Sequence, residues 1–135
     1  MRVLLWYCEK FAWTPAMKTL DDAPEAAPGD HKNAVVAFVH IEPKDIENGG
    51  STETRLVKTI KWLARKNETN TVLLHSFTHL GEDKAEPGQA REILQRAQER
   101  LQKAGYEAFQ TPWGHFLNLE MNAPGHPLAR IFKEW

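Results

Sequence analysis

Residues 34–42, AVVAFVHIE, constrain the fold more than any other part of the chain. The run is apolar and rich in β-branched side chains, and Pro43 follows it directly. Proline has no amide hydrogen to offer a strand ladder, so it marks the end of the run. A short apolar run that ends at such a breaker predicts a buried strand. We therefore expect a β-sheet whose interior includes this segment.

The rest of the chain alternates between strand-like and helix-like patterns. Four more stretches have strand composition, namely residues 2–13, 70–77, 106–111 and 115–121. Two stretches have apolar residues at helical spacing, namely residues 51–66 and 87–105. Residues 21–33 are rich in proline and acidic residues, which predicts a surface loop.

The chain ends in a pattern typical of a helix. Leu128, Ile131, Phe132 and Trp135 are spaced i, i+3, i+4 and i+7, so we expect a short helix there. The full order of elements is then β-β-α-β-α-β-β-α. This order predicts an α/β fold in which helices pack on a mixed β-sheet.

Length and charge limit the organisation and the partners. The 135 residues fit one domain, residues 1–135. The net charge of −1 creates no overall positive field, so any RNA contact must come from a local basic patch. Cys8 is the one cysteine, which excludes an internal disulfide and indicates a reducing compartment. The apolar run after Met1 is too short to span a bilayer, so we expect a cytoplasmic protein without membrane contact.

The segment HSFTHLG follows the third predicted strand and carries His75, Ser76, Phe77, Thr78 and His79. The carboxyl ends of strands in α/β sheets are common ligand sites. His79 is therefore a candidate general base or a hydrogen-bond partner for a substrate. The alternative is that both histidines are structural, one buried and one capping the loop.

Two further segments combine turns with histidines. PWGHFLNLEM places Gly114 and His115 in a tight turn that feeds a strand, although an ordinary hairpin has the same pattern. PGHPLAR resembles a turn followed by a helix cap more than a site. The spacing of the six histidines does not form a zinc-binding set, and phosphate-loop and serine-hydrolase motifs are absent from the sequence. We therefore expect neither a metal nor a cofactor.

One basic ridge offers a place for a phosphate backbone. Three- and four-residue steps on the predicted helix 51–66 put its basic side chains on one face: Arg55, Lys58, Lys61 and Arg65. Such a ridge is a candidate tRNA contact, although a solvated helix face gives the same pattern.

Taken in order, these segments resemble the editing domain of archaeal threonyl-tRNA synthetases, which has the fold of the D-aminoacyl-tRNA deacylases. The resemblance runs through MRVLL, VVAFVHIE, FTHLG, PWG and GHPLAR, nearly the whole chain. It implies hydrolysis of serine wrongly attached to threonine's tRNA, with the terminal ribose hydroxyl assisting. No synthetase catalytic domain follows Trp135, so we expect a free-standing version that works in trans, beside a separate threonyl-tRNA synthetase.

The resemblance also implies a site. His79 matches the family's histidine, and the pocket is lined largely by the main chain of Ile41, Ser76, Phe77 and Thr78. We expect the pocket between the strand around His40–Ile41, the loop Ser76–His79 and the segment Gly114–Leu117. We also expect His75 and His115 to bind the substrate and to compensate for polar side chains that the family has and this sequence lacks.

The sequence departs from the family at three positions. Phe116 and Leu117 stand where the family has tyrosine and lysine, and Ala129 stands where it often has glutamate. Phenylalanine cannot donate a hydrogen bond and leucine carries no cation. The main hypothesis is a deacylase. The alternatives are a binding protein derived from the editing domain and, third, a metal-dependent hydrolase.

We also expect a homodimer. Trp13, Trp113 and Trp135 fall at the ends of predicted elements, where a small domain buries side chains least easily. Members of the family pair through their sheets as well.

Overall fold

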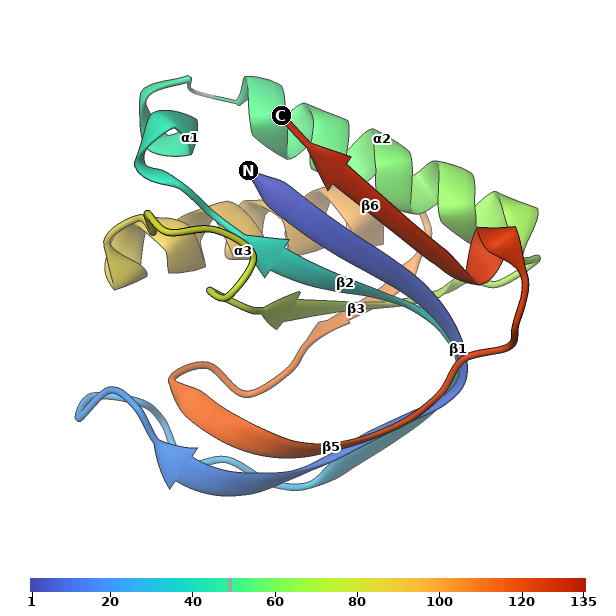
Figure 1. Ribbon diagram of the computed structural model, residues 1–135, viewed down its shortest axis with the longest axis horizontal. Helices are drawn as coiled ribbons and strands as arrows, with labels where there is room; N and C mark the ends of the chain where they lie inside the picture. Colours follow the sequence, from blue (N-terminus) through green and yellow to red (C-terminus); the bar gives the residue numbers. More distant parts are fainter. Residues whose placement is uncertain (49) are drawn as a thin grey trace.

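A curled six-stranded sheet carries three helices on one face in the computed structural model, which describes residues 1–48 and 50–135 (Figure 1). The strands are β1 (Arg2–Lys18), β2 (Gly29–His40), β3 (Thr71–Ser76), β4 (Glu107–Gln110), β5 (His115–Asn122) and β6 (Arg130–Glu134). The helices are α1 (Pro43–Glu47), α2 (Ser51–Lys66) and α3 (Pro87–Lys103), and a 3₁₀ turn η1 covers Pro127–Ala129.

The sheet is mixed, as the order of elements predicted. Its strand order is β4-β3-β2-β1-β5, with β6 also paired to β1. The pairs β2–β3 and β3–β4 are parallel, and the three pairs made by β1 are antiparallel. Parallel neighbours need long crossovers, and α2 and α3 supply them. The α/β fold is confirmed.

Strand β1 shapes the sheet because it changes partner along its length. Its first half pairs with β6 and its second half pairs with β5, while β2 runs along its other side. The register shifts between Pro15 and Met17. The far end of β1 curls with β5 beneath β3, so the sheet becomes a half-barrel (Figure 1).

Two apolar layers result from this curl. The helix-covered face buries one layer, which includes Leu56, Ile60 and Leu94. The concave face holds the second, which includes Phe11 and Phe38, and none of the described helices lies over it (Figure 1). From Ala34 to His40, β2 is buried on both faces, so this stretch lacks an apolar–polar alternation.

The predicted C-terminal helix is wrong. Residues 127–129 form one 3₁₀ turn, and the chain then continues as β6, with Leu5 opposite Ile131 in the ladder with β1. The segment is short for an isolated helix, whereas the first half of β1 offers a free strand edge for pairing. The loop predicted for residues 21–33 is also shorter, since β2 begins at Gly29.

The tryptophans do not provide the exposed surface that motivated the expectation of a dimer. Trp13 is buried, and Trp113 and Trp135 are half-buried against the core. Trp13 packs in the apolar layer of Phe11 and Phe38, and its Nε1 donates to the carbonyl of Ala27 at 3.0 Å. The larger exposed apolar side chains include Met17 and Phe116, which face each other across the β1–β5 ladder.

A buried ion pair joins the start of β1 to α1. The ammonium group of Met1 lies 2.9 Å from a carboxylate oxygen of Asp45 and 2.9 Å from one of Glu42. Burial raises the pKa of the Glu42 carboxyl, but the hydrogen bond and charge of the ammonium group, with Lys44 and Arg2, lower it overall. Both side chains therefore hold α1 against the start of β1.

Candidate functional site

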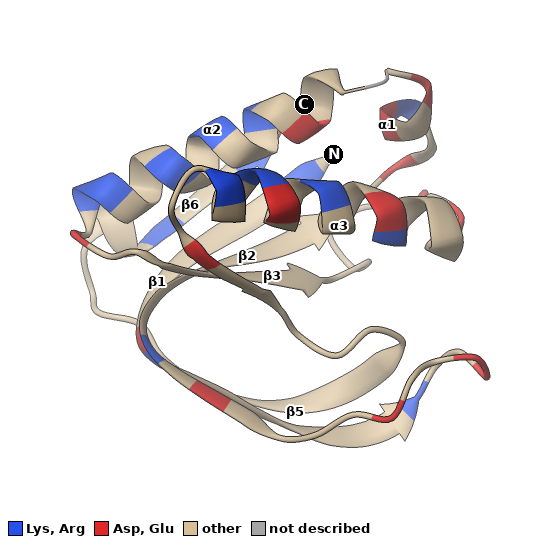
Figure 2. Ribbon diagram, turned by 180° about the vertical axis from the view of Figure 1, so that it is seen from behind, with Lys and Arg blue, Asp and Glu red and all other residues tan. Residues whose placement is uncertain are grey.

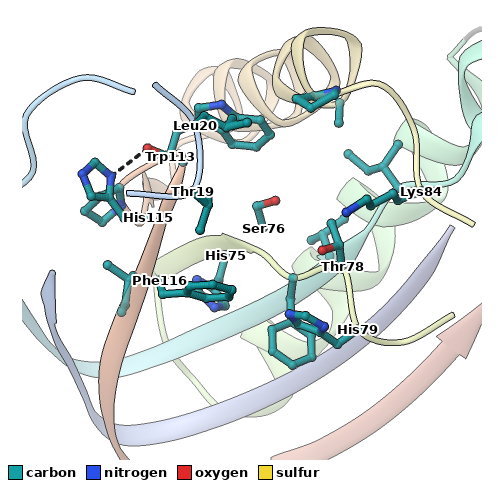
Figure 3. A pocket seen from close by; sticks show the side chains of 18 of the residues that line it. Thr19, Leu20, His75, Ser76, Thr78, His79, Lys84, Trp113, His115 and Phe116 are labelled. Atoms are coloured by element: carbon teal, nitrogen blue, oxygen red, sulfur yellow. Dashed lines mark hydrogen bonds between the residues drawn. The ribbon is translucent and has the colours of Figure 1, made fainter. Parts of the chain in front are cut away.

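A cavity of about 330 Å³ lies where β3 ends, between the N-terminus of α3 and the curled part of the sheet (Figure 3). Three segments far apart in sequence meet around it: the end of β2, the loop after β3, and the turn before β5. These are the three segments from which the sequence predicted a pocket.

Most residues predicted for the site do line this cavity. They are Ile41, His75, Ser76, Phe77, Thr78, His79, Gly114, His115, Phe116 and Leu117. His40 is not among the lining residues. Sequence reasoning missed further lining residues, among them Thr19, Leu20, Lys84, Ala90 and Trp113.

The loop that carries His79 leaves the sheet abruptly. The amide of Phe77 still donates to the carbonyl of Val39, 3.0 Å away, as a continuation of the β2–β3 ladder. Thr78 and His79 then turn out to the exposed rim of the cavity. An imidazole exposed at a cavity rim can exchange protons with water and with a bound substrate.

Aromatic rings fix the orientation of His79. Its ring stacks on Phe116, with centroids 6.5 Å apart and planes inclined by 19°. The edge contact with Phe77 has centroids 5.1 Å apart at 73°. His79 thereby links the loop after β3 to β5 across the cavity.

His75 has a different environment, although it lies only four residues away. Its Nδ1 is 2.8 Å from the hydroxyl of Thr111, and its ring packs against Phe38 with centroids 4.8 Å apart. Burial lowers the pKa of His75 to about 4. The residue is therefore uncharged at neutral pH and is held in place, which suits a structural wall of the cavity.

The turn that carries His115 requires a glycine. Gly114 has φ +74°, and a Cβ there would lie 2.7 Å from the Cβ of Ala23. The turn brings the Nδ1 of His115 to 3.0 Å from the carbonyl of Trp113 (Figure 3). Since a carbonyl can only accept, Nδ1 carries the donated proton.

His40 supports the site from behind. Its side chain is fully buried, its Nδ1 accepts from the amide of Leu80 at 3.1 Å, and its Nε2 donates to the carbonyl of Asp83 at 2.6 Å. The prediction placed His40 at the substrate because it adjoins Ile41. Successive residues of a strand point to opposite faces, so the two neighbours have different surroundings.

The whole chain, residues 1–135, matches a family described as the archaea-specific editing domain of threonyl-tRNA synthetase. The chain belongs to this family. The chain is also similar to threonine–tRNA ligases, which agrees with this family. It is 31% identical to the threonine–tRNA ligase of Pyrobaculum arsenaticum, over 98% of the chain and 22% of that ligase. The ligase of Hyperthermus butylicus is 28% identical over 100% of the chain and 23% of the ligase. The chain thus spans under a quarter of the length of these relatives.

A solved structure shows the same fold. The c-Myc DNA Unwinding Element Binding Protein superposes with a TM-score of 0.69 at 12% identity, over 100% of this chain and 99% of that one. At this identity the likeness concerns the fold alone. It agrees with the predicted fold of the D-aminoacyl-tRNA deacylases, which is confirmed.

The three departures from the editing-domain pattern lie in two different places. Phe116 and Leu117 line the cavity, with 53% of Phe116 exposed. Ala129 is fully buried in η1 and is not a lining residue. A glutamate at position 129 would need a buried partner for its charge in this structure. The apolar change within the cavity therefore concerns two positions and not three.

The predicted basic ridge lies apart from the cavity. Arg55, Lys58 and Arg65 are exposed and Lys61 is half-buried, and Figure 2 shows basic residues as bands along α2. None of the described residues that line the cavity comes from α2. Any tRNA contact on the ridge would therefore involve a part of the tRNA outside the cavity.

Within residues 1–48 and 50–135, no group of three histidine, cysteine or acidic side chains is placed to hold a metal ion. None of the described helices is both long and apolar enough to cross a bilayer. Burial raises the pKa of the Cys8 thiol to about 11, so the thiol is not a nucleophile at neutral pH.

Proposed function

We propose that this editing domain hydrolyses the ester that joins a wrong amino acid, of the serine type, to tRNA, and that it acts in trans. The observation that carries the proposal is the position of His79. An exposed imidazole lies at the rim of a cavity, next to a strand end whose backbone groups can read an amino acid. Membership of the editing-domain family supports a mischarged aminoacyl-tRNA as the substrate.

The chemistry of threonine explains why a second site is useful. Serine differs from threonine by one methyl group, and a binding pocket discriminates one methyl group by only about 1–3 kcal/mol. A synthetase that needs higher accuracy must remove serine after the transfer. A hydrolytic site that admits the smaller side chain of serine can remove it.

The reaction is water attack on an ester carbonyl. The water oxygen forms a bond to the carbonyl carbon, and the ester bond to the ribose oxygen breaks. The ribose oxygen takes up a proton and leaves as part of the tRNA, while the amino acid departs as the free acid. His79 is placed to position the water or to relay its proton, because an imidazole can both accept and donate a hydrogen.

A second candidate function is binding without hydrolysis. Phe116 and Leu117 favour it, because they remove from the cavity wall the hydroxyl and the cation that the resemblance implies. Such a protein would hold tRNA or an amino-acid-like ligand and leave the ester intact.

We further propose that the protein works in the cytoplasm on aminoacylated tRNA, beside a separate threonyl-tRNA synthetase, and as a homodimer. Exposed apolar side chains on β5 and its neighbour β1 support pairing: Met17, Phe116 and Leu119. Strand β5 lies at the end of the strand order, so its outer edge can accept a second copy.

Deacylation of a panel of seryl-, threonyl- and alanyl-tRNA tests the proposal. We expect hydrolysis of seryl-tRNA above the buffer control, and little hydrolysis of threonyl-tRNA. Binding of all three without hydrolysis would support the binding protein instead.

A further inference from the structure

The loop Leu80–Ala85 is fixed to the sheet at both of its ends. His40 accepts from the amide of Leu80 and donates to the carbonyl of Asp83. The amide of Ala85 donates to the carbonyl of Ile41 at 2.9 Å. On the outer side, Arg2 donates to the carbonyl of Leu80 at 2.9 Å. Lys84 therefore lies between two anchored positions of the backbone.

The two hydrogen bonds of His40 fix a single tautomer of its ring. An amide can only donate, so Nδ1 is the acceptor, and a carbonyl can only accept, so Nε2 carries the proton. One fully buried side chain thus satisfies two backbone groups of a loop that has no strand or helix of its own. Its removal would take away the partner of one part-buried amide and one part-buried carbonyl and would loosen the loop.

Lys84 brings a positive charge to the cavity. Figure 3 shows its side chain extending toward the cavity beside Thr78. Of the described lining residues, Lys84 is the one lysine or arginine, and none is aspartate or glutamate. A site lined in this way favours an anionic group in its ligand.

We propose that Lys84 binds the phosphate that links the 3′-terminal nucleotide to the rest of the tRNA, and that His40 is the positioning residue that holds Lys84 there. This inference rests on the proposed function. Lys84 is exposed, and its ammonium is a hydrated point charge on a flexible stem. Stabilisation of an oxyanion needs a preorganised donor away from water, so the exposed ammonium suits a phosphate at the cavity mouth better than the reacting carbonyl.

The test uses a non-hydrolysable analogue, 3′-seryl-amido-3′-deoxyadenosine, with and without a 5′-phosphate, and measures binding by calorimetry. We expect the phosphate to strengthen binding to the wild type about fivefold, as for an exposed charge pair of about 1 kcal/mol. Lys84→Met removes this gain, so the variant binds the two probes with equal affinity. Lys84→Arg retains it. Lys133→Met, an exposed lysine on β6, is the matched control and retains it too.

His40→Gln tests the positioning role. We expect it to reduce the phosphate gain, and the double variant with Lys84→Met to lose no more than Lys84→Met alone. A merely structural role would weaken both probes equally and add to the effect of Lys84→Met. If His40→Gln does not fold, Arg2→Gln provides the same comparison, because it removes the hydrogen bond that Arg2 donates to the carbonyl of Leu80.

The outcomes separate the two proposals. If the wild type binds both probes and Lys84→Met changes neither affinity, or both equally, Lys84 does not read the phosphate and the inference is wrong, while the proposed function stands. If the wild type binds neither probe at millimolar concentration, the proposed function fails and the inference fails with it.

Discussion

His79 and Phe116 stack across the cavity, with ring centroids 6.5 Å apart and planes inclined by 19°. The contact joins the loop after β3 to β5, so the two segments that the resemblance made most important are physically coupled. It also presents an apolar ring next to the imidazole, where a tyrosine would add a hydroxyl. The residue at position 116 can therefore change the surroundings of the His79 ring and, through them, its role in hydrolysis.

Restoring the family pair should raise activity. Phe116→Tyr with Leu117→Lys adds a hydroxyl and a cation to the cavity wall, and we expect at least a tenfold faster hydrolysis of seryl-tRNA, from about 1.4 kcal/mol of added stabilisation. Asn118→Lys, which adds a cation on the same strand outside the cavity, is the matched control and should change little. An unchanged rate in the restored variant would show that these positions do not limit catalysis.

Acid should destabilise the fold through His75. Its pKa is about 4 in the native protein and has its ordinary value of 6.5 in the unfolded chain. Between these values the unfolded chain binds a proton that the native state does not, so the free energy of unfolding falls as the pH drops from 6.5 to 4. The loss amounts to up to about 3 kcal/mol.

Urea unfolding of the wild type and His75→Gln across this pH range provides the measurement. The variant should have a flatter profile, whereas His126→Gln, at an exposed histidine, should follow the wild type. Parallel profiles for the wild type and His75→Gln would contradict the assignment.

The ion pair at the start of β1 should contribute strongly to stability. Asp45→Asn leaves the buried ammonium of Met1 with one carboxylate fewer, and we expect a loss of about 3 kcal/mol in the free energy of unfolding. Asp22→Asn, at an exposed aspartate, is the control and should cost little. A loss below that of the control in thermal or urea unfolding would show that Asp45 is dispensable.

The proposed homodimer has a direct test. Light scattering should give about twice the chain mass of 15.4 kDa over a wide range of concentrations. Met17→Glu places a charge on the apolar surface formed with Phe116, so it should shift the mass toward the monomer. A monomeric mass for the wild type at every concentration would rule the dimer out.

Periodicity predicted the buried interior well, because local patterns carry that information. The apolar run around Val35 and the helical face around Ile60 were both placed correctly. The C-terminal strand could not be predicted from its own residues. Ile131 has helical spacing with its neighbours, but it pairs with Leu5 across the chain, and such pairing is a property of the whole fold.

Two features of the site needed the structure for a similar reason. His40 lies in a strand that is buried on both faces, so no alternation in sequence tells which of its faces meets the cavity. Lys84 lies in a charged loop, GEDKAEP, whose composition indicates only exposure. Its place at the cavity follows from the anchoring of the loop by His40, which joins residues 43 positions apart.

The proposed function is hydrolysis of mischarged tRNA at the cavity of His79. The most direct measurement is the rate of deacylation of seryl-tRNA by the wild type, His79→Ala and the restored pair, with a chelator present throughout. We expect hydrolysis by the wild type above buffer, a rate at least tenfold slower but not abolished in His79→Ala, and a faster rate in the restored pair. If neither the wild type nor the restored pair hydrolyses seryl-, threonyl- or alanyl-tRNA, the proposed deacylase function is wrong and binding without hydrolysis takes its place.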